Sequence, residues 1–324
     1  MEVSKVKPVQ ADIIYYHGDC VDGMAAAWVA WRWMRKHRPD SLVHLLEAHY
    51  GKPLDIPTDW YKPEDDVVMH VLDFSIPVED LKDACAKCNV KTLYYIDHHP
   101  TGKSHIEAAV AEASDWGVDM AAWFDNGPGK SGASLAWDNY FPNEPVPLSI
   151  LRVADRDTWT FKYFDSKTFH AYAALFLKDE MRWDDVFENE KYNENIVKGS
   201  AIRLQIESIV NKYVQPELHQ NVVYGEYNGV AVNVGREFVS EVCNNILESN
   251  PQIDFVLGYQ IHPMHVKFDF RARQSDDINV GTIAKYWGGG GHPAAAGLLI
   301  PKTHCYSSGT RLQDFLKKVK LNLF

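Results

Sequence analysis

The sequence contains no long hydrophobic run, and this absence narrows the classes of protein that it can encode. None of its 324 residues lies in an apolar stretch of about eighteen or more, the length that a membrane-spanning helix needs. Residues 1–12 hold no apolar segment of the kind found in secretion signals. We therefore expect no membrane partner and take the cytoplasm as the default location.

Cysteine is also scarce. The sequence has five cysteines, namely Cys20, Cys85, Cys88, Cys243 and Cys305. An odd and sparse set does not describe the disulfide framework of a small secreted protein. Cys85 and Cys88 have the spacing of a zinc or redox pair, but no second Cys/His pair at a suitable spacing accompanies them. We interpret both as ordinary, partly buried helix cysteines.

Positively charged side chains are fewer than negatively charged ones. The chain has 33 Lys and Arg against 44 Asp and Glu, which gives a net charge of −11. Such a protein lacks the general basic surface that binds long nucleic acids, so we expect no long duplex as a partner. A short anionic substrate fits better, since local positive charge or a metal ion can bind it. The composition leaves the oligomeric state open.

Hydrophobic residues, by contrast, make up 46% of the chain, and its length suggests two domains. In the first half, apolar runs at 13–17, 66–72 and 92–96 predict strands, and segment 41–46 predicts another. The intervening segments 22–37 and 77–88 predict helices. Alternating strands and helices are typical of a parallel sheet covered by helices on both faces.

The second half has a different pattern. Segment 186–215 is polar with apolar residues at helical spacing, and we interpret it as a connecting helix. Beyond it we expect strands at 229–234, 255–261 and 265–270, and helices at 237–249 and 278–287. The prediction is an α/β chain, with an N-terminal parallel-sheet domain at 1–185, a helical linker at 186–215 and a smaller α/β domain at 216–324.

Three polar residues follow predicted strands of the first domain. His17, Asp73 and Asp97 each stand at the carboxyl end of an apolar run. Ligands bind at that edge of open α/β sheets, so we favour a shared site over three unrelated solvated loops. Imidazoles and carboxylates suit Mn²⁺. The candidate ligands are His17, Asp19, Asp22, Asp73, Asp97, His98 and Asp155. They are too many for one ion and predict two, with one carboxylate bridging.

A glycine run in the second domain forms a separate candidate site. It consists of Gly288, Gly289, Gly290 and Gly291, and His292 follows. Consecutive glycines let the backbone approach a ligand, and their N–H groups can bind phosphate oxygens. On the preceding strand Arg271 and Arg273 alternate, face one side and suit phosphate. The alternative is a tight structural turn with surface arginines, and the pattern alone does not decide between the two.

These motifs resemble the DHH phosphoesterase family with its DHH-associated C-terminal domain, including oligoribonuclease and nucleotide phosphodiesterase members. Asp97-His98-His99 matches the motif that names the family, and Asp73-Phe74-Ser75 resembles its second motif. The run from Gly288 to Gly297 resembles the glycine-rich motif of the associated domain, and Arg271 stands where the substrate-binding arginine of that domain usually precedes it.

The resemblance implies hydrolysis of phosphoester or phosphoanhydride bonds with Mn²⁺. It implies that Asp73 bridges two ions and that His98 and Asp155 complete one of the two sites. Asp97 would support the ligands, and His99 would contact the scissile phosphate. By the same resemblance, His292, Arg271 and the backbone of Gly289, Gly290 and Gly291 would hold another part of the substrate. Asp157 is the alternative to Asp155, as a supporting acid.

The first motif departs from the family pattern, which has two aspartates separated by one residue. Aligning the small residues after Gly23 places Asp22 at the second aspartate and Cys20 at the first. Asp19 could substitute if the loop shifts by one residue. A Cys20 thiolate would favour a softer ion than Mn²⁺. The alternative, which we favour from the sequence, is a buried, inert Cys20.

Our leading functional hypothesis is a metal-dependent phosphodiesterase acting on short oligonucleotides or dinucleotides. A second hypothesis is a phosphatase acting on 3′-phosphonucleotides or polyphosphate. A third, motivated by the altered first motif, is a nucleotide-binding regulator that has lost catalysis.

Overall fold

The computed structural model describes residues 10–50, 52–58, 60–61, 65–274, 277–302 and 311–323, so Cys305 lies outside the described residues. The chain divides into two compact units, Met1–Arg203 and Leu204–Phe324. Each unit has its own sheet, and each is described here by itself.

The sheet of the first unit is five-stranded and fully parallel, in the order β2-β1-β3-β4-β5. Its strands are β1 (Gln10–His17), β2 (Leu42–Ala48), β3 (Asp66–Leu72), β4 (Val90–Asp97) and β5 (Asp119–Phe124). Six of the seven residues of β3 are buried. Burial on both faces explains why β1, β3 and β4 are near-continuous apolar runs in the sequence.

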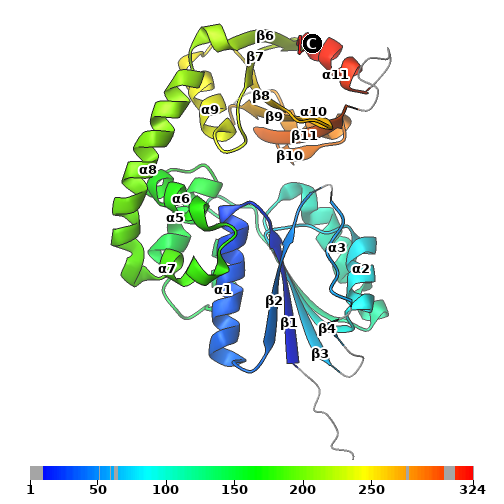
Figure 1. Ribbon diagram of the computed structural model, residues 1–324. Helices are drawn as coiled ribbons and strands as arrows, with labels where there is room; N and C mark the ends of the chain where they lie inside the picture. The colour runs from blue at the N-terminus through cyan, green and yellow to red at the C-terminus, as the bar shows by residue number, and fades with distance from the viewer. Residues whose placement is uncertain are drawn as a thin grey trace, which may run out of the picture. The chain divides into compact units, whose positions relative to one another are not determined.

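Helices cover both faces of this sheet (Figure 1). On one side lie α1 (Val21–His37), α4 (Gly132–Tyr140), α5 (Leu148–Asp157), α6 (Ser166–Ala173) and α7 (Trp183–Phe187); on the other lie α2 (Val78–Lys87) and α3 (Lys103–Glu112). Alternation along β1 feeds the two cores: Ile14 and Tyr16 pack into the first, Ile13 and Tyr15 into the second.

The long helix α8 (Tyr192–Tyr213) crosses the division between the units. Its first half contributes Ile196 and Ile202 to a core of the first unit, and its second half contributes Ile206 and Val210 to a core of the second. The predicted connecting helix therefore has apolar residues for two separate cores, which explains its mixed sequence pattern.

The second unit has a six-stranded mixed sheet in the order β10-β11-β9-β8-β7-β6. Its strands are β6 (His219–Tyr224), β7 (Tyr227–Asn233), β8 (Phe255–Ile261), β9 (His265–Ala272), β10 (Gly290–His292) and β11 (Ala295–Pro301). Among the described residues of this sheet, only β7 and β8 pair in parallel. One face carries α10 (Val280–Tyr286) and α11 (Arg311–Val319), and the other carries α9 (Val239–Ser249).

Short 3₁₀ helices connect several of these elements. They are η1 (Pro100–Gly102), η2 (Ala113–Trp116), η3 (Ala174–Phe176), η4 (Glu180–Arg182), η5 (Asn189–Lys191) and η6 (Pro216–Leu218). The predicted fold class, a parallel-sheet unit, a connecting helix and a smaller α/β unit, is confirmed. Strands β5, β6, β10 and β11 were not predicted. Across the described ranges, no helix combines the length and apolar character needed to cross a membrane.

A buried polar network ties the first sheet to its helices. The carboxylate of Asp12, in β1, accepts a hydrogen bond from Arg38 at 2.7 Å and lies 3.2 Å from Nε2 of His70 in β3. Nδ1 of His70 lies 2.6 Å from the hydroxyl of Tyr140 in α4. A neutral His70 satisfies both contacts, since Nε2–H donates to Asp12 and Nδ1 accepts from Tyr140.

This network predicts a loss of stability on acidification. Burial lowers the pKa of His70 in the folded protein, although the Asp12 carboxylate opposes the shift. In the unfolded chain His70 titrates near its ordinary pKa of about 6.5. The unfolded state therefore binds more protons below that pH, and the free energy of unfolding falls as the pH drops from about 7 to 5. His70→Gln should flatten this fall in urea titrations, and an unchanged slope would contradict the assignment.

Candidate metal centre

The candidate ligands gather at the carboxyl edge of the first sheet. His17 ends β1, Asp97 ends β4, and Asp73 follows β3. Asp22 lies in the first turn of α1, and Asp157 ends α5. The parallel topology therefore brings side chains from five segments to one edge, as the strand-end rule predicts.

Asp73 is the most constrained residue of this group. Its backbone has φ +54°, in the left-handed region that only a few per cent of non-glycine residues adopt, and its side chain is 1% exposed. Oδ2 lies 3.5 Å from Nδ1 of His17, and Oδ1 lies 3.1 Å from Nε2 of His98. Neither carboxylate oxygen accepts a hydrogen bond from any described residue. A buried, strained carboxylate without donors is typical of a ligand site.

Asp97 orients the motif that follows it. Its Oδ1 accepts hydrogen bonds from the backbone N–H of His98 at 2.8 Å and of His99 at 3.2 Å, and from Nδ1 of His99 at 2.7 Å. Because Nδ1 of His99 faces Asp97, the opposite ring nitrogen, Nε2, points away from Asp97. Asp97 therefore fixes the backbone of the two histidines that follow it and the ring of His99.

His98 lies among three carboxylates. Its Nε2 is 3.1 Å from Asp73, 3.5 Å from Asp157 and 3.8 Å from Asp22. Burial alone would lower the pKa of His98, but Asp73 and Asp157 raise it to about 11. The centre thus holds a strongly negative potential that a cation relieves.

Asp22 is held rigidly by the start of α4. Its Oδ1 accepts hydrogen bonds from Ser131 Oγ at 2.7 Å and from the backbone N–H of Ala133 at 3.1 Å, and its Oδ2 accepts one from Gly132 N–H at 2.6 Å. Burial, together with the charge of Asp73, raises the pKa of this carboxyl. Asp22 is therefore fixed in position beside the other acids.

The structure distinguishes Asp155 from Asp157. The carboxylate of Asp155 accepts hydrogen bonds from the backbone N–H groups of Lys162 at 2.7 Å and Tyr163 at 3.1 Å, and from the hydroxyl of Ser166. It fixes the loop after α5 and takes part in none of the possible metal-binding groups among the described residues. Asp157 forms such a group with Asp22 and His98. The structure thus places Asp157 where the sequence favoured Asp155.

The first motif shows a similar substitution. Asp19, with φ +55°, lies 3.0 Å from Lys178 Nζ and 3.8 Å from Nδ1 of His49. Cys20 instead shares a possible metal-binding group with His17 and Asp73. Burial and the charge of Asp73 raise the pKa of the Cys20 thiol well above its ordinary value.

The residues fit a pair of divalent ions. Three groups have mutual ligand-atom distances within 4.8 Å, namely His17-Cys20-Asp73, Asp73-His98-His99 and Asp22-His98-Asp157. Neighbouring groups share Asp73 or His98, as adjacent ions with a common ligand require. Both oxygens of Asp73, Nδ1 of His17 and Oδ2 of Asp97 are buried without a hydrogen-bond partner among the described residues.

A cluster of aromatic and basic side chains lies on both sides of Asp157 in the sequence. We call Arg156, Trp159, Phe161 and Lys167 the aromatic–basic cluster. The Arg156 guanidinium lies 4.2 Å from the Trp159 ring centroid, and Lys167 Nζ lies 4.6 Å from that of Phe161. Trp159 and Phe161 both have positive φ, 56° and 49°. Burial and the charges of Arg156 and Arg203 lower the pKa of nearby His170 to about 3.

In the second unit, two backbone N–H groups of the glycine run already donate hydrogen bonds within the fold. The N–H groups of Gly288 and Gly289 donate to the carbonyls of Lys285 and Ala284, which end α10. A Cβ at Gly290 would meet no atom within 4 Å, whereas one at Gly291 (φ +141°) would lie 2.5 Å from the carbonyl oxygen of Ala295. Gly290 is therefore the most open position, and Gly291 permits the close pairing with β11.

Arg271, in β9, and Arg273, just beyond its end, have different surroundings. The Arg271 guanidinium donates to Ser240 Oγ at 2.9 Å and to the carbonyl of Phe270 at 2.8 Å. Arg273 donates to the carbonyls of Ile253, Leu247 and Asn250, at and just beyond the end of α9. Arg273 therefore caps a helix. His292 ends β10, whose register places it opposite Ala295, the partner of Arg271.

Comparisons with known proteins agree with this architecture. Residues 220–323 match the DHHA1 domain. A structure described as the DHH domain of a member of a ribosomal-protein family aligns with a TM-score of 0.63 and 14% identity, over 95% of this chain and 86% of that one. Exonuclease RecJ bound to manganese aligns with a TM-score of 0.53 and 12% identity, over 95% and 90%.

A relative outside the solved structures is an uncharacterized protein of Acanthamoeba polyphaga mimivirus. It is 24% identical over 298 residues, which span 89% of this chain and 67% of that protein. Residues 220–323 thus match a DHHA1 domain and the chain has the fold of these two solved structures, so the resemblance expected from the motifs is confirmed.

The different surroundings of Asp155 and Asp157 predict different effects of the same change. Asp157→Asn removes a charged ligand and should weaken Mn²⁺ binding by at least about tenfold in calorimetric titrations, with little change in melting temperature. Asp155→Asn should cost about 1–3 kcal/mol of unfolding free energy, because its buried hydrogen bonds change, and should leave Mn²⁺ affinity near that of the unaltered protein. If Asp155→Asn instead weakened Mn²⁺ binding and Asp157→Asn only lowered stability, Asp155 and not Asp157 would be the metal ligand.

Proposed function

We propose that the protein is a divalent-metal-dependent phosphodiesterase that hydrolyses short oligonucleotides or dinucleotides. The observation that carries this proposal is Asp73, a buried carboxylate without hydrogen-bond donors among the described residues, between His17 and His98. A bridging ligand of two ions needs both oxygens available, and such a carboxylate in this fold supports phosphoester chemistry.

The side chains divide between two ion positions. His17 would serve the first, and Asp22, His98 and Asp157 would serve the second, with Asp73 shared. Mn²⁺ is the ion that we expect from the resemblance. Two such ions supply an activated water and a positive clamp on phosphate oxygens during in-line attack.

The remaining residues of the site position these ligands and the substrate. Asp97 fixes the ring of His99 through Nδ1–H, and an imidazolium form of His99 would donate from Nε2–H to an oxygen of the scissile phosphate. Ser131 and the N–H groups of α4 hold Asp22 in one orientation. Such fixed positions lower the cost of ordering ligands and substrate before reaction.

The aromatic–basic cluster supports a nucleotide substrate over a simple phosphate ester. Its aromatic rings can stack on bases, and its cations can pair with phosphates. Lys167 forms no ion pair with a carboxylate of the described residues. Phe164, in the same loop, is 96% exposed and offers a further stacking surface. In the second unit, Arg271, Gly289, Gly290, Gly291 and His292 would hold another part of the substrate.

A substrate panel tests the proposal directly. With Mn²⁺, the protein should release mononucleotides from labelled dinucleotides and oligonucleotides of a few residues faster than from long RNA. Asp73→Asn should abolish this activity, because it removes one charge from the shared ligand. Phosphate release from 3′-phosphonucleotides or polyphosphate alone would favour the phosphatase alternative. Nucleotide binding without turnover with any divalent ion would favour an inactive regulator.

The cluster makes a separate prediction about substrate recognition. Trp159→Ala should raise KM for a dinucleotide by about 5- to 150-fold, the equivalent of roughly 1–3 kcal/mol of stacking, with a smaller effect on kcat. Hydrolysis of bis(p-nitrophenyl) phosphate, which has no base, serves as the control. An equal loss on both substrates would show that Trp159 supports the fold of the loop and not base binding.

A further inference from the structure

Cys20 occupies a position where its side chain has no capping role. It is the N-cap residue of α1, with φ −129° and ψ 132°, and its side chain makes no capping hydrogen bond. Ser, Thr, Asp and Asn are preferred at N-caps because their side-chain oxygens accept such a bond. Here the chain places a sulfur at a helix start and does not use it to cap the helix.

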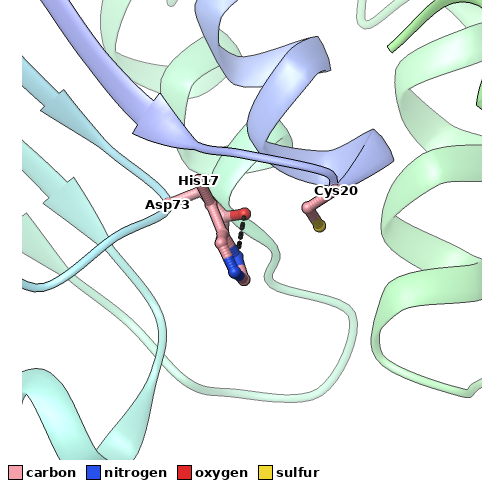
Figure 2. A group of neighbouring side chains, drawn as sticks. All are labelled: His17, Cys20 and Asp73. Carbon is pink, nitrogen blue, oxygen red and sulfur yellow. Dashed lines mark ion pairs between the residues drawn. The ribbon is translucent and has the colours of Figure 1, made fainter. Parts of the chain in front are cut away.

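The thiol instead lies beside two metal-ligand side chains. Figure 2 shows Cys20 with His17 and Asp73, which come from the start of α1, the end of β1 and the end of β3. Their ligand atoms all lie within 4.8 Å of one another. In a tetrahedral site with bonds of about 2.0–2.3 Å, ligand atoms stand roughly 3.3–3.8 Å apart, so small side-chain movements would let these three atoms bind one ion.

Independent evidence for a ligand comes from the two neighbours of Cys20. Both oxygens of Asp73 and Nδ1 of His17 are buried without a hydrogen-bond partner among the described residues. These atoms are where an ion between His17 and Asp73 would bind. They support a cation at this position whatever residue stands at 20.

Asp19 does not compensate for the sulfur. Its carboxylate is 3.0 Å from Lys178 Nζ and takes part in none of the metal-binding groups of the described residues. The donor set of the first ion position is therefore one imidazole, one carboxylate and one thiol.

We propose that Cys20 Sγ is a thiolate ligand of the first ion, and that the His17–Cys20–Asp73 site prefers Zn²⁺, Co²⁺ or Fe²⁺ to Mn²⁺. This rests on the two-ion centre of the proposed function. Thiolate is a soft ligand that selects such ions over Mn²⁺. On binding, the thiol gives its proton to solvent and the sulfur lone pair forms the bond to the ion. The amino terminus of α1 favours the negative sulfur.

Cobalt spectroscopy on the full chain tests the inference without reference to activity. Titration of the metal-free protein with Co²⁺ should produce a sulfur-to-cobalt charge-transfer band in the near ultraviolet. The band should be lost in Cys20→Ser and Cys20→Asp and retained in Cys88→Ala, a matched control at a buried cysteine of the same unit. Circular dichroism checks that each variant is folded, and bound Co²⁺ is counted by mass spectrometry.

Each outcome has a distinct meaning. Bound Co²⁺ without the band in the unaltered protein, or a band that persists in both folded Cys20 variants, would overturn the thiolate assignment and leave the two-ion centre intact. Failure to bind any divalent ion would overturn the proposed function as well.

Metal competition gives a second readout. Dialysed against equal concentrations of Zn²⁺ and Mn²⁺, the unaltered protein should retain Zn²⁺ at the first position, and Cys20→Asp should shift its Zn²⁺/Mn²⁺ ratio by at least about tenfold toward Mn²⁺. The same ratio in both proteins would contradict the inference.

Discussion

The candidate metal centre depends on one energetically unfavourable arrangement. The Asp73 carboxylate is buried without hydrogen-bond donors among the described residues. A buried charge is costly unless it is paired, and Asp73 also adopts a left-handed backbone conformation. Contacts with His17 and His98 offset part of this cost and hold the pKa of Asp73 well below its usual range, although burial opposes that shift. The surrounding fold must be stable enough to keep this residue in place.

Several features of the first unit serve that purpose. The parallel sheet places the ends of β1, β3 and β4 together, and the two apolar cores on its faces fix the strands. The start of α4 packs tightly against Asp73: a Cβ at Gly132 would lie 2.4 Å from that of Asp73. The same turn binds Asp22 through backbone N–H groups. The centre is thus built on rigid elements, with loops contributing mainly Asp73 and the turn at Cys20.

Much of this arrangement follows from the sequence. Continuous apolar runs predicted β1, β3 and β4, and the polar residues after them are indeed brought to one edge. What the sequence could not decide was the direction of neighbouring side chains. Asp155 and Asp157 lie on the same helix end, about 200° apart around its axis, and only tertiary packing selects the one that faces His98. The choice between Asp19 and Cys20 depends likewise on where α1 begins. The aromatic–basic cluster needed positive φ at Trp159 and Phe161, which their residue types do not favour.

The most direct test of the central claim is a crystal structure of the metal-free protein soaked in excess Mn²⁺ as the sole divalent ion, with anomalous differences measured at the manganese edge. The account predicts two peaks that flank Asp73, one near His17 and one near His98 and Asp157. A map with no anomalous peak at Asp73, or with a single ion that Asp155 binds, would contradict it.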